Sequence, residues 1–264
     1  MRGLLWLRPL LLWALLGPVT LWADVRLEVT GTVMPTSEAL EVRLSFANRG
    51  DTTATSVDVE GELLSRRLRG RLVAIPAGEE RVLLLRYPPE VPRPGVHPLT
   101  LVADYSAGSG GARASQCLYL LLALGAGASP PVSLTVEEVR LDSYGPLTVG
   151  VTSADAQAHR VRLRVVTARG LRADPPVDLE VPAVGEVRAR LPLLRAGAPR
   201  DSRQGVLVVA EEATGPLARA VVATAVVRVL PDPAWMPRLR WPLLALATLL
   251  LLVALVFEVR GGRA

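Results

Sequence analysis

Residues 40–51 read LEVRLSFANRGD, and this stretch decides the fold class. Apolar side chains occupy every second position from 40 to 46, and charged or polar side chains lie between them. A period of two places the apolar side chains on one face of a β-strand, whereas a helix would repeat them every three or four positions. The Asn-Arg-Gly-Asp segment that follows is typical of a tight turn. The stretch therefore predicts a strand with one buried face that ends in a turn.

The same alternation extends on both sides of this strand. Residues 25–29 and 57–59 alternate in the same way, and turn residues recur at 76–78, 92–95 and 106–111. Short strands separated by turns at intervals of 8–12 residues are typical of a β-sandwich. Helical periodicity is absent from this part of the chain. The sequence predicts an all-β domain over residues 24–124.

A second domain follows a segment of small residues and prolines, GAGASPP at 125–131, which we interpret as a linker. The sequence VSLTV at 132–136 resembles VRLEV at 25–29, and PAVGE at 182–186 resembles PAGE at 76–79. Each pair is separated by about the same number of residues, which indicates a duplicated domain. The predicted fold class is all-β, with two tandem immunoglobulin-like β-sandwiches at 24–124 and 132–230 and one C-terminal transmembrane helix.

Both ends of the chain carry apolar segments. Residues 1–23 combine a basic start, a short apolar run and a Gly-Pro break, which are the parts of a secretory signal peptide. Residues 241–257 are 17 consecutive uncharged residues, and with the two residues that follow they form a 19-residue segment, close to the length that spans a bilayer, with arginines on both sides. We therefore expect a signal peptide, a stalk at 231–240, a membrane helix at Trp241–Val259 and a cytoplasmic tail at 260–264.

Three motifs of the first domain resemble a known family. They are VRLSFANRGD at 42–51, PAGE at 76–79 and PGVHPLTL at 94–101. In these motifs the domain resembles the CARDB-type (cell-adhesion-related) and NEW3-like bacterial immunoglobulin-like domains, over about residues 24–124. The second domain has Ser153-Ala154-Asp155-Ala156 where the family has its Asn-Gly turn. The resemblance implies a non-catalytic module used in envelope proteins for spacing and adhesion, and it implies no active-site residue.

The residues that could carry catalysis or bind a metal are few. The two histidines, His97 and His159, fall in different predicted domains, and neither has cysteines or paired carboxylates at ligand spacing. The single cysteine, Cys117, cannot form an internal disulfide, and its apolar surroundings favour a small core residue over a reactive thiol. The Arg49-Gly50-Asp51 tripeptide is interpreted as a turn, not as an adhesion motif. We expect no enzyme activity, no cofactor, no metal and no small-molecule substrate.

Two segments are candidates for interactions. The first is a basic cluster formed by Arg66, Arg67, Arg69 and Arg71, which could contact an anionic glycan, lipid headgroups or an acidic partner. The alternative is a solvated edge strand whose charges prevent aggregation, with Glu60 and Glu62 neutralising part of the charge. The second is the nearly continuous apolar strand 117–122. Either a partner or the second domain covers it, or it is a central strand of its sheet.

These features predict a membrane-anchored extracytoplasmic scaffold or interaction protein, an accessory subunit of a bacterial envelope complex. The chain has no lysine, one isoleucine and one asparagine, which is typical of a GC-rich bacterial genome. Other envelope or membrane proteins are the expected partners, and nucleic acid is not. The expected location is the bacterial inner membrane, with a single span and an extracytoplasmic body. Two alternatives stay open: a surface protein whose C-terminal tail is cut by a sorting protease, and a carbohydrate-binding module.

Overall fold

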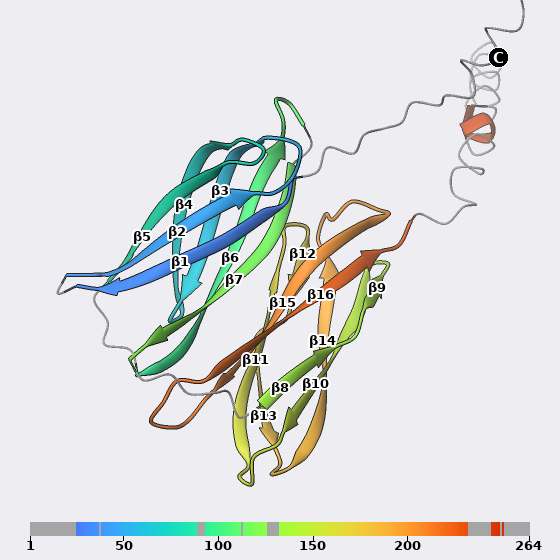
Figure 1. The fold of residues 1–264 in the computed structure, drawn as a ribbon. Coiled ribbons are helices and arrows are strands. Elements are labelled where there is room, and N and C mark those ends of the chain that lie inside the picture. The colour runs from blue at the N-terminus through green and yellow to red at the C-terminus, as the bar shows by residue number, and fades with distance from the viewer. Residues whose placement is uncertain are drawn as a thin grey trace, which may run out of the picture. The chain divides into compact units, whose positions relative to one another are not determined.

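The computed structural model describes residues 25–36, 38–88, 93–111, 113–125, 132–231, 244–248 and 250. The chain divides into two compact units, Met1–Gly127 and Ala128–Ala264, which are called unit 1 and unit 2. The described residues of both units are nearly all β, as predicted, and form sandwich-like pairs of sheets (Figure 1). The predicted signal peptide, most of the linker, the stalk after Pro231, most of the membrane segment and the predicted tail lie outside the described residues.

Unit 1 consists of a three-stranded and a four-stranded sheet, and all their strand pairs are antiparallel. The three-stranded sheet has the order β1 (Leu27–Pro35), β2 (Leu40–Asn48), β5 (Glu80–Tyr87). The four-stranded sheet has the order β4 (Arg66–Ile75), β3 (Ala54–Leu63), β6 (Gly95–Ala107), β7 (Arg113–Leu124).

The core of unit 1 lies between these two sheets. In β2, the strand predicted from residues 40–51, Val42, Leu44 and Phe46 are fully buried, and the residues between them are less buried. The side chain of Gln116 on β7 closes one seam of the sandwich: its Nε2 donates to the backbone oxygen of Leu27 on β1 (2.9 Å), and its Oε1 accepts from the Leu27 N–H (3.1 Å). One side chain thus replaces a pair of strand-to-strand hydrogen bonds between the sheets.

Unit 2 has a four-stranded and a five-stranded sheet. The four-stranded sheet has the order β12 (Leu171–Ala173), β14 (Gly185–Arg195), β10 (Tyr144–Ser153), β8 (Val132–Val136). The five-stranded sheet has the order β13 (Val177–Val181), β11 (His159–Thr167), β15 (Ser202–Glu212), β16 (Ala220–Val229), β9 (Val139–Leu141).

Two segments of unit 2 cross from one sheet to the other. After β8 the chain leaves the four-stranded sheet, and β9 joins the five-stranded sheet beside β16 in parallel. In the same way β12 belongs to the four-stranded sheet and β13 to the five-stranded one. The core between the sheets is formed by valine, leucine and alanine, with Leu141, Leu147 and Leu163 fully buried.

Each unit is entered at one end and left at the other. In unit 1, β1 starts opposite Asn48, the last residue of β2. The last strand, β7, ends opposite Gly95 and close to Leu40, the first residue of β2, which is the other end of the unit. In unit 2 Val132 pairs with Ser153, the last residue of β10. The chain leaves β16 near Leu141, three residues before β10 begins, and this end is called the exit end of unit 2.

The apolar strand 117–122 does not match the central-strand alternative, because β7 is a terminal strand of its sheet. Leu118 and Leu120 pack against the core, whereas Tyr119 and Leu121 point outward and are 36% and 47% exposed. The leucines of this strand are therefore split between the core and the surface.

The C-terminal apolar segment is described at Leu244–Thr248 and Leu250, which are helical, and the Thr248 hydroxyl donates to the Leu244 oxygen. No helix within the described residues is long and apolar enough to cross a membrane.

Candidate interaction surfaces and turn sites

Three of the four arginines of the predicted basic cluster lie in one row along β4. Arg67, Arg69 and Arg71 alternate with Leu68, Gly70 and Leu72, so the three guanidinium groups point outward. Arg66 lies on the opposite face of the strand, next to the turn that joins β3 to β4, and is exposed because the sheet ends there. The structure brings three of the predicted residues together and places the fourth elsewhere.

Each arginine of this row faces a carboxylate on β3. The register places Glu62, Glu60 and Asp58 opposite Arg67, Arg69 and Arg71. The shortest distances between nitrogen and oxygen are 2.7 Å for Arg67–Glu62, 3.0 Å for Arg69–Glu60 and 2.6 Å for Arg71–Asp58. The cluster is thus a ladder of cross-strand ion pairs, in which the neutralisation expected from Glu60 and Glu62 is extended by Asp58.

The ladder is electrostatically satisfied although it is solvent-exposed. The hydrogen bond from Arg71 lowers the pKa of Asp58 below its usual value, and the nearby charge of Arg113 adds to this. The bond to Glu62 raises the pKa of Arg67 in turn. Cross-strand pairs of opposite charge stabilise a sheet modestly and define its register. The ladder fits the edge-strand interpretation, because β4 is the other terminal strand of its sheet.

Cys117 lies on the outward face of β7, opposite Val102, and it does not belong to the core cluster. Its neighbours nevertheless shield it from most of the solvent. This burial raises the pKa of the Cys117 thiol to about 12, and the charge of Asp104 adds to the effect. The expected role as a core residue is therefore wrong, although the thiol is shielded.

The folded chain is expected to react slowly with iodoacetamide, because only the thiolate attacks. With the pKa at about 12 instead of 9.0, the thiolate fraction at pH 8 falls about a thousandfold. The measurement is the alkylation rate by mass spectrometry at pH 8, in buffer and in urea. Below pH 12 the rate in buffer should rise about tenfold per pH unit, and equal rates in buffer and urea would contradict the assignment.

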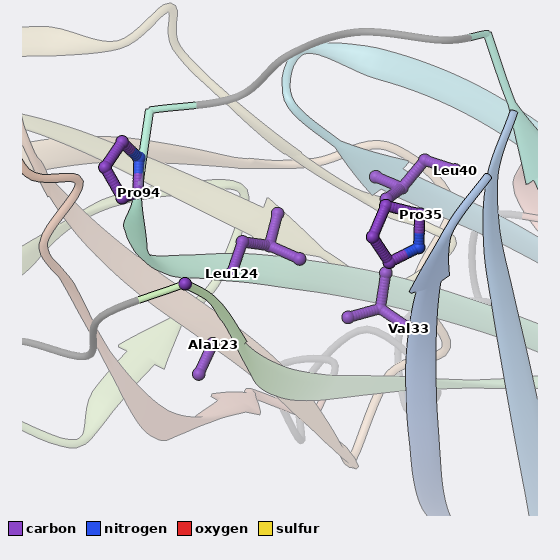
Figure 2. A pocket seen from close by; sticks show the side chains of 7 residues that line it. Val33, Pro35, Leu40, Pro94, Ala123 and Leu124 are labelled. Carbon is purple, nitrogen blue, oxygen red and sulfur yellow. The ribbon is translucent and has the colours of Figure 1, made fainter. Parts of the chain in front are cut away.

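A pocket of about 340 Å³ lies in unit 1, between the ends of its two sheets (Figure 2). It is lined by Val33, Pro35, Leu40, Pro94, Ala123, Leu124 and Gly125. The volume lies at the small end of the range for ligand sites, but these side chains offer no charge and no hydrogen bond to orient a polar ligand. The pocket therefore supplies apolar surface and no chemistry.

The two turns at 48–51 and 76–79 of unit 1 are held together by Asn48, which is fully buried. Its Nδ2 donates to the backbone oxygens of Thr52 (2.8 Å) and Ile75 (3.0 Å), and its Oδ1 accepts from the Gly50 N–H (3.0 Å). Its backbone oxygen accepts from the N–H of Gly78, which has a φ of +74° that glycine tolerates. The Asn-x-Gly and Pro-x-Gly-Glu motifs thus form one site, and the Arg-Gly-Asp tripeptide is part of its turn.

Unit 2 builds the corresponding site with other residues. The Val184 N–H donates to the backbone oxygen of Asp155 (2.9 Å), as the Gly78 N–H does to the backbone oxygen of Asn48. Val184 has a φ of +47° although it is β-branched. The Asp155 N–H donates to the hydroxyl of buried Ser153 (3.1 Å). The shared turn bond supports the duplication that the sequence repeats predict.

His159 lies at this site and is only 5% exposed. Its Nε2 lies 3.1 Å from Oδ2 of Asp155, and its Nδ1 lies 3.1 Å from Oε1 of Glu212, whose other oxygen is 3.7 Å from Arg219. The two carboxylates thus lie at the two nitrogen atoms of one buried ring. Sequence reasoning missed this site because Glu212 is 53 residues away; the signal within reach was Asp155, four residues before the histidine.

The hydroxyl of Tyr87 is buried and has no hydrogen-bond partner among the described residues, whereas the Tyr105 hydroxyl donates to the Val25 oxygen (3.2 Å). Tyr87→Phe is expected to raise the free energy of unfolding of unit 1 by about 1 kcal/mol, because it removes an unsatisfied polar group. Tyr105→Phe is the matched control and should lower it by about 1 kcal/mol. Urea unfolding of the full chain measures both, and two changes of the same sign would refute the contrast.

Comparison with known proteins adds no family. No family model matches the chain, and no curated protein matches it. Among solved structures, trypsin-activated α2-macroglobulin from Escherichia coli matches 79% of this chain and 18% of its own length, with 11% identity and a TM-score of 0.32. Red sea bream transglutaminase matches 77% of this chain and 31% of its own length, with 16% identity and a TM-score of 0.28.

A protein of unknown function from Porphyromonas gingivalis is matched over 99% of its length and 77% of this chain, with 17% identity and a TM-score of 0.31. The chain thus spans less than a third of the macroglobulin and of the transglutaminase. TM-scores this low establish neither a shared function nor a shared arrangement of the units. The chain is similar to these structures over most of its length, and no family is assigned.

Proposed function

We propose that this chain is a non-catalytic, membrane-anchored extracytoplasmic scaffold in a bacterial envelope complex. In this proposal its two sandwiches hold a partner at a set distance from the inner membrane. The observation that carries the proposal is the path of the chain: each unit is entered at one end and left at the other. Strands of about 10 residues at about 3.3 Å per residue give each unit a length of about 33 Å.

The strand orders support an immunoglobulin-like assignment for both units. Unit 1 divides seven strands into sheets of three and four, with chain neighbours β2 and β3 in different sheets. Unit 2 keeps this plan if β8–β9 and β12–β13 are each counted as one strand that changes sheet. These sandwiches, together with the motifs of unit 1, are the basis for proposing CARDB-type domains.

The membrane attachment is proposed from the sequence of residues 241–259, and the extracytoplasmic location from residues 1–23. The test is to purify the full chain from membranes in mild detergent, with an affinity tag inserted in the exposed turn at Ser109. A membrane protein should co-purify at a fixed ratio. A clean monomer in the medium or cell wall would refute the scaffold, and mass spectrometry of its C-terminus would then test processing by a sorting protease.

A further inference from the structure

Three arginines from separate segments form a row on the outer face of the five-stranded sheet of unit 2. Arg203 on β15 lies opposite Arg228 on β16, which lies opposite Arg140 on β9. All three side chains are exposed. The three strands are neighbours in the sheet (Figure 1), so this arginine row is continuous across it.

The arginine row differs from the arginines of β4 and β11 that face carboxylates. In the ladder on β4 each arginine faces a carboxylate, and on β11 Arg162 faces Asp178 at 2.8 Å. Within the described residues no carboxylate lies within 4.0 Å of the row, and Glu138 only lines the same hollow as Arg203. Like charges directly opposite one another destabilise a sheet. The row therefore has no explanation in the stability of the fold.

The row lies at the exit end of unit 2. Arg228 is the last residue but one of β16, and Arg203 is the second residue of β15. Ten residues separate Leu230 from the apolar segment that begins at Trp241, and two of them are Arg238 and Arg240. Even a fully extended chain of this length reaches about 38 Å. The exit end is thus the part of unit 2 tethered closest to the proposed anchor.

The four-stranded sheet presents a second row at the same end. Tyr144 on β10 lies opposite Leu194 on β14, which lies opposite Arg172 on β12. Tyr144 is 61% exposed and Leu194 is 39% exposed, and Arg172 is exposed beside them. Tyrosine and arginine are the side chains enriched where proteins meet lipid headgroups. Among the described acids at this end, Asp142 is bound by Arg200, which lowers the pKa of Asp142, and Asp201 is exposed immediately before β15.

We propose that the exit end of unit 2 is a membrane-docking surface, on which Arg140, Arg203 and Arg228 bind the phosphates of anionic lipid headgroups. This inference rests on the proposed membrane attachment, because the tether is what keeps the end close to the bilayer. The planar guanidinium groups suit bidentate contacts with phosphate oxygens. Each arginine near an anionic surface contributes about fivefold to the ratio of docked to undocked protein, and three together contribute about a hundredfold.

The test uses the full chain with Cys117→Ala, carrying a fluorophore on Val226→Cys, which lies on the face of the arginine row. The chain is reconstituted in phosphatidylcholine vesicles with and without phosphatidylserine, both containing a nitroxide quencher on the headgroups. We expect strong quenching only with phosphatidylserine, and screening by salt should weaken it. A fluorophore on Ala183→Cys, in the turn between β13 and β14 at the other end of unit 2, should not be quenched.

The decisive variant carries Arg140→Gln, Arg203→Gln and Arg228→Gln, and it should reduce the docked ratio about a hundredfold. The matched control removes the same charge from the ladder, with Arg67→Gln, Arg69→Gln and Arg71→Gln, and should leave the quenching unchanged. Thermal unfolding followed by circular dichroism establishes that both variants are folded. Quenching that does not depend on phosphatidylserine, or that survives the first variant, would overturn the docking surface.

Flotation of the same full-length protein separates the two proposals. If the chain floats with pure phosphatidylcholine vesicles but shows no lipid-dependent quenching, the anchor stands and the docking surface is overturned. If it fails to float with neutral vesicles but floats with phosphatidylserine through the three arginines, the docking surface stands and the anchor fails. If an acidic protein is retained through these arginines, and the triple variant leaves the lipid-dependent quenching unchanged, the row binds a protein and the lipid assignment is overturned.

Discussion

Asn48→Ala is expected to lower the free energy of unfolding of unit 1 by about 4 kcal/mol. The side chain is fully buried and makes three hydrogen bonds, to the oxygens of Thr52 and Ile75 and from the N–H of Gly50. Alanine leaves these three backbone groups buried without a partner, at about 1–3 kcal/mol each, and relaxation of the turn offsets part of the loss. Losses of this size are exceptional for a single substitution.

The measurement is urea unfolding of the full chain, followed by the signal of unit 1. Gly78→Ala tests the neighbouring turn as a control: its φ of +74° penalises a side chain, but nothing lies within 4 Å, so a cost of about 1 kcal/mol is expected. Asn48→Asp keeps the acceptor for Gly50 but aims a carboxylate at two carbonyl oxygens, and it should be at least as damaging as alanine. A cost below that of Gly78→Ala would refute the role of Asn48.

His159→Leu is expected to destabilise unit 2 by about 3 kcal/mol. The imidazole is buried between the carboxylates of Asp155 and Glu212, each 3.1 Å from a ring nitrogen. Leucine fills similar space but removes the ring contact of Glu212, whose side chain is 13% exposed and whose other oxygen is 3.7 Å from Arg219. A buried polar group that loses its hydrogen-bond partner costs more than the hydrogen bond itself contributes.

The matched control for this substitution is the other histidine. His97 is 8% exposed, but among the described residues its ring has one hydrogen-bond partner, the backbone oxygen of Arg93 at 2.8 Å from Nε2. His97→Leu should therefore cost about 1 kcal/mol. The double variant His159→Leu with Glu212→Leu should be less damaging than the sum of its parts, because the two residues interact directly. Strict additivity would show that the contact contributes nothing.

The sequence predicted those parts of the fold that depend on local patterns. Alternation at 40–46 and 132–136 marked β2 and β8, because each strand buries one face. The turn between β3 and β4 could not be predicted. Leu64 and Ser65 both adopt positive φ, whereas turns of this kind are usually formed by Asn, Asp or Gly. The three-residue strand β9 is too short to give a period, and its place beside β16 depends on a contact distant in sequence.

The candidate surfaces divide in the same way. The four arginines of β4 are visible as a run, but only the register reveals that three of them face a carboxylate. The arginine row of unit 2 is invisible in the sequence, because its members come from positions 140, 203 and 228 and meet only through strand pairing. The dense run of arginines on β4 is thus neutralised by carboxylates, whereas three arginines scattered in the sequence form the surface with uncompensated positive charge.

The path of the chain through each unit also determines how it responds to mechanical force. Traction between an anchor and a partner acts along the strands, so the hydrogen bonds that hold the terminal strands are loaded in shear and must break together. In unit 2 the short strand β9, which follows the first strand β8, pairs directly and in parallel with the last strand, β16. In unit 1 β1 and β7 belong to different sheets and are joined at Gln116 by two side-chain bonds. Under tension unit 1 is expected to open first, while unit 2 keeps its connection to the anchor.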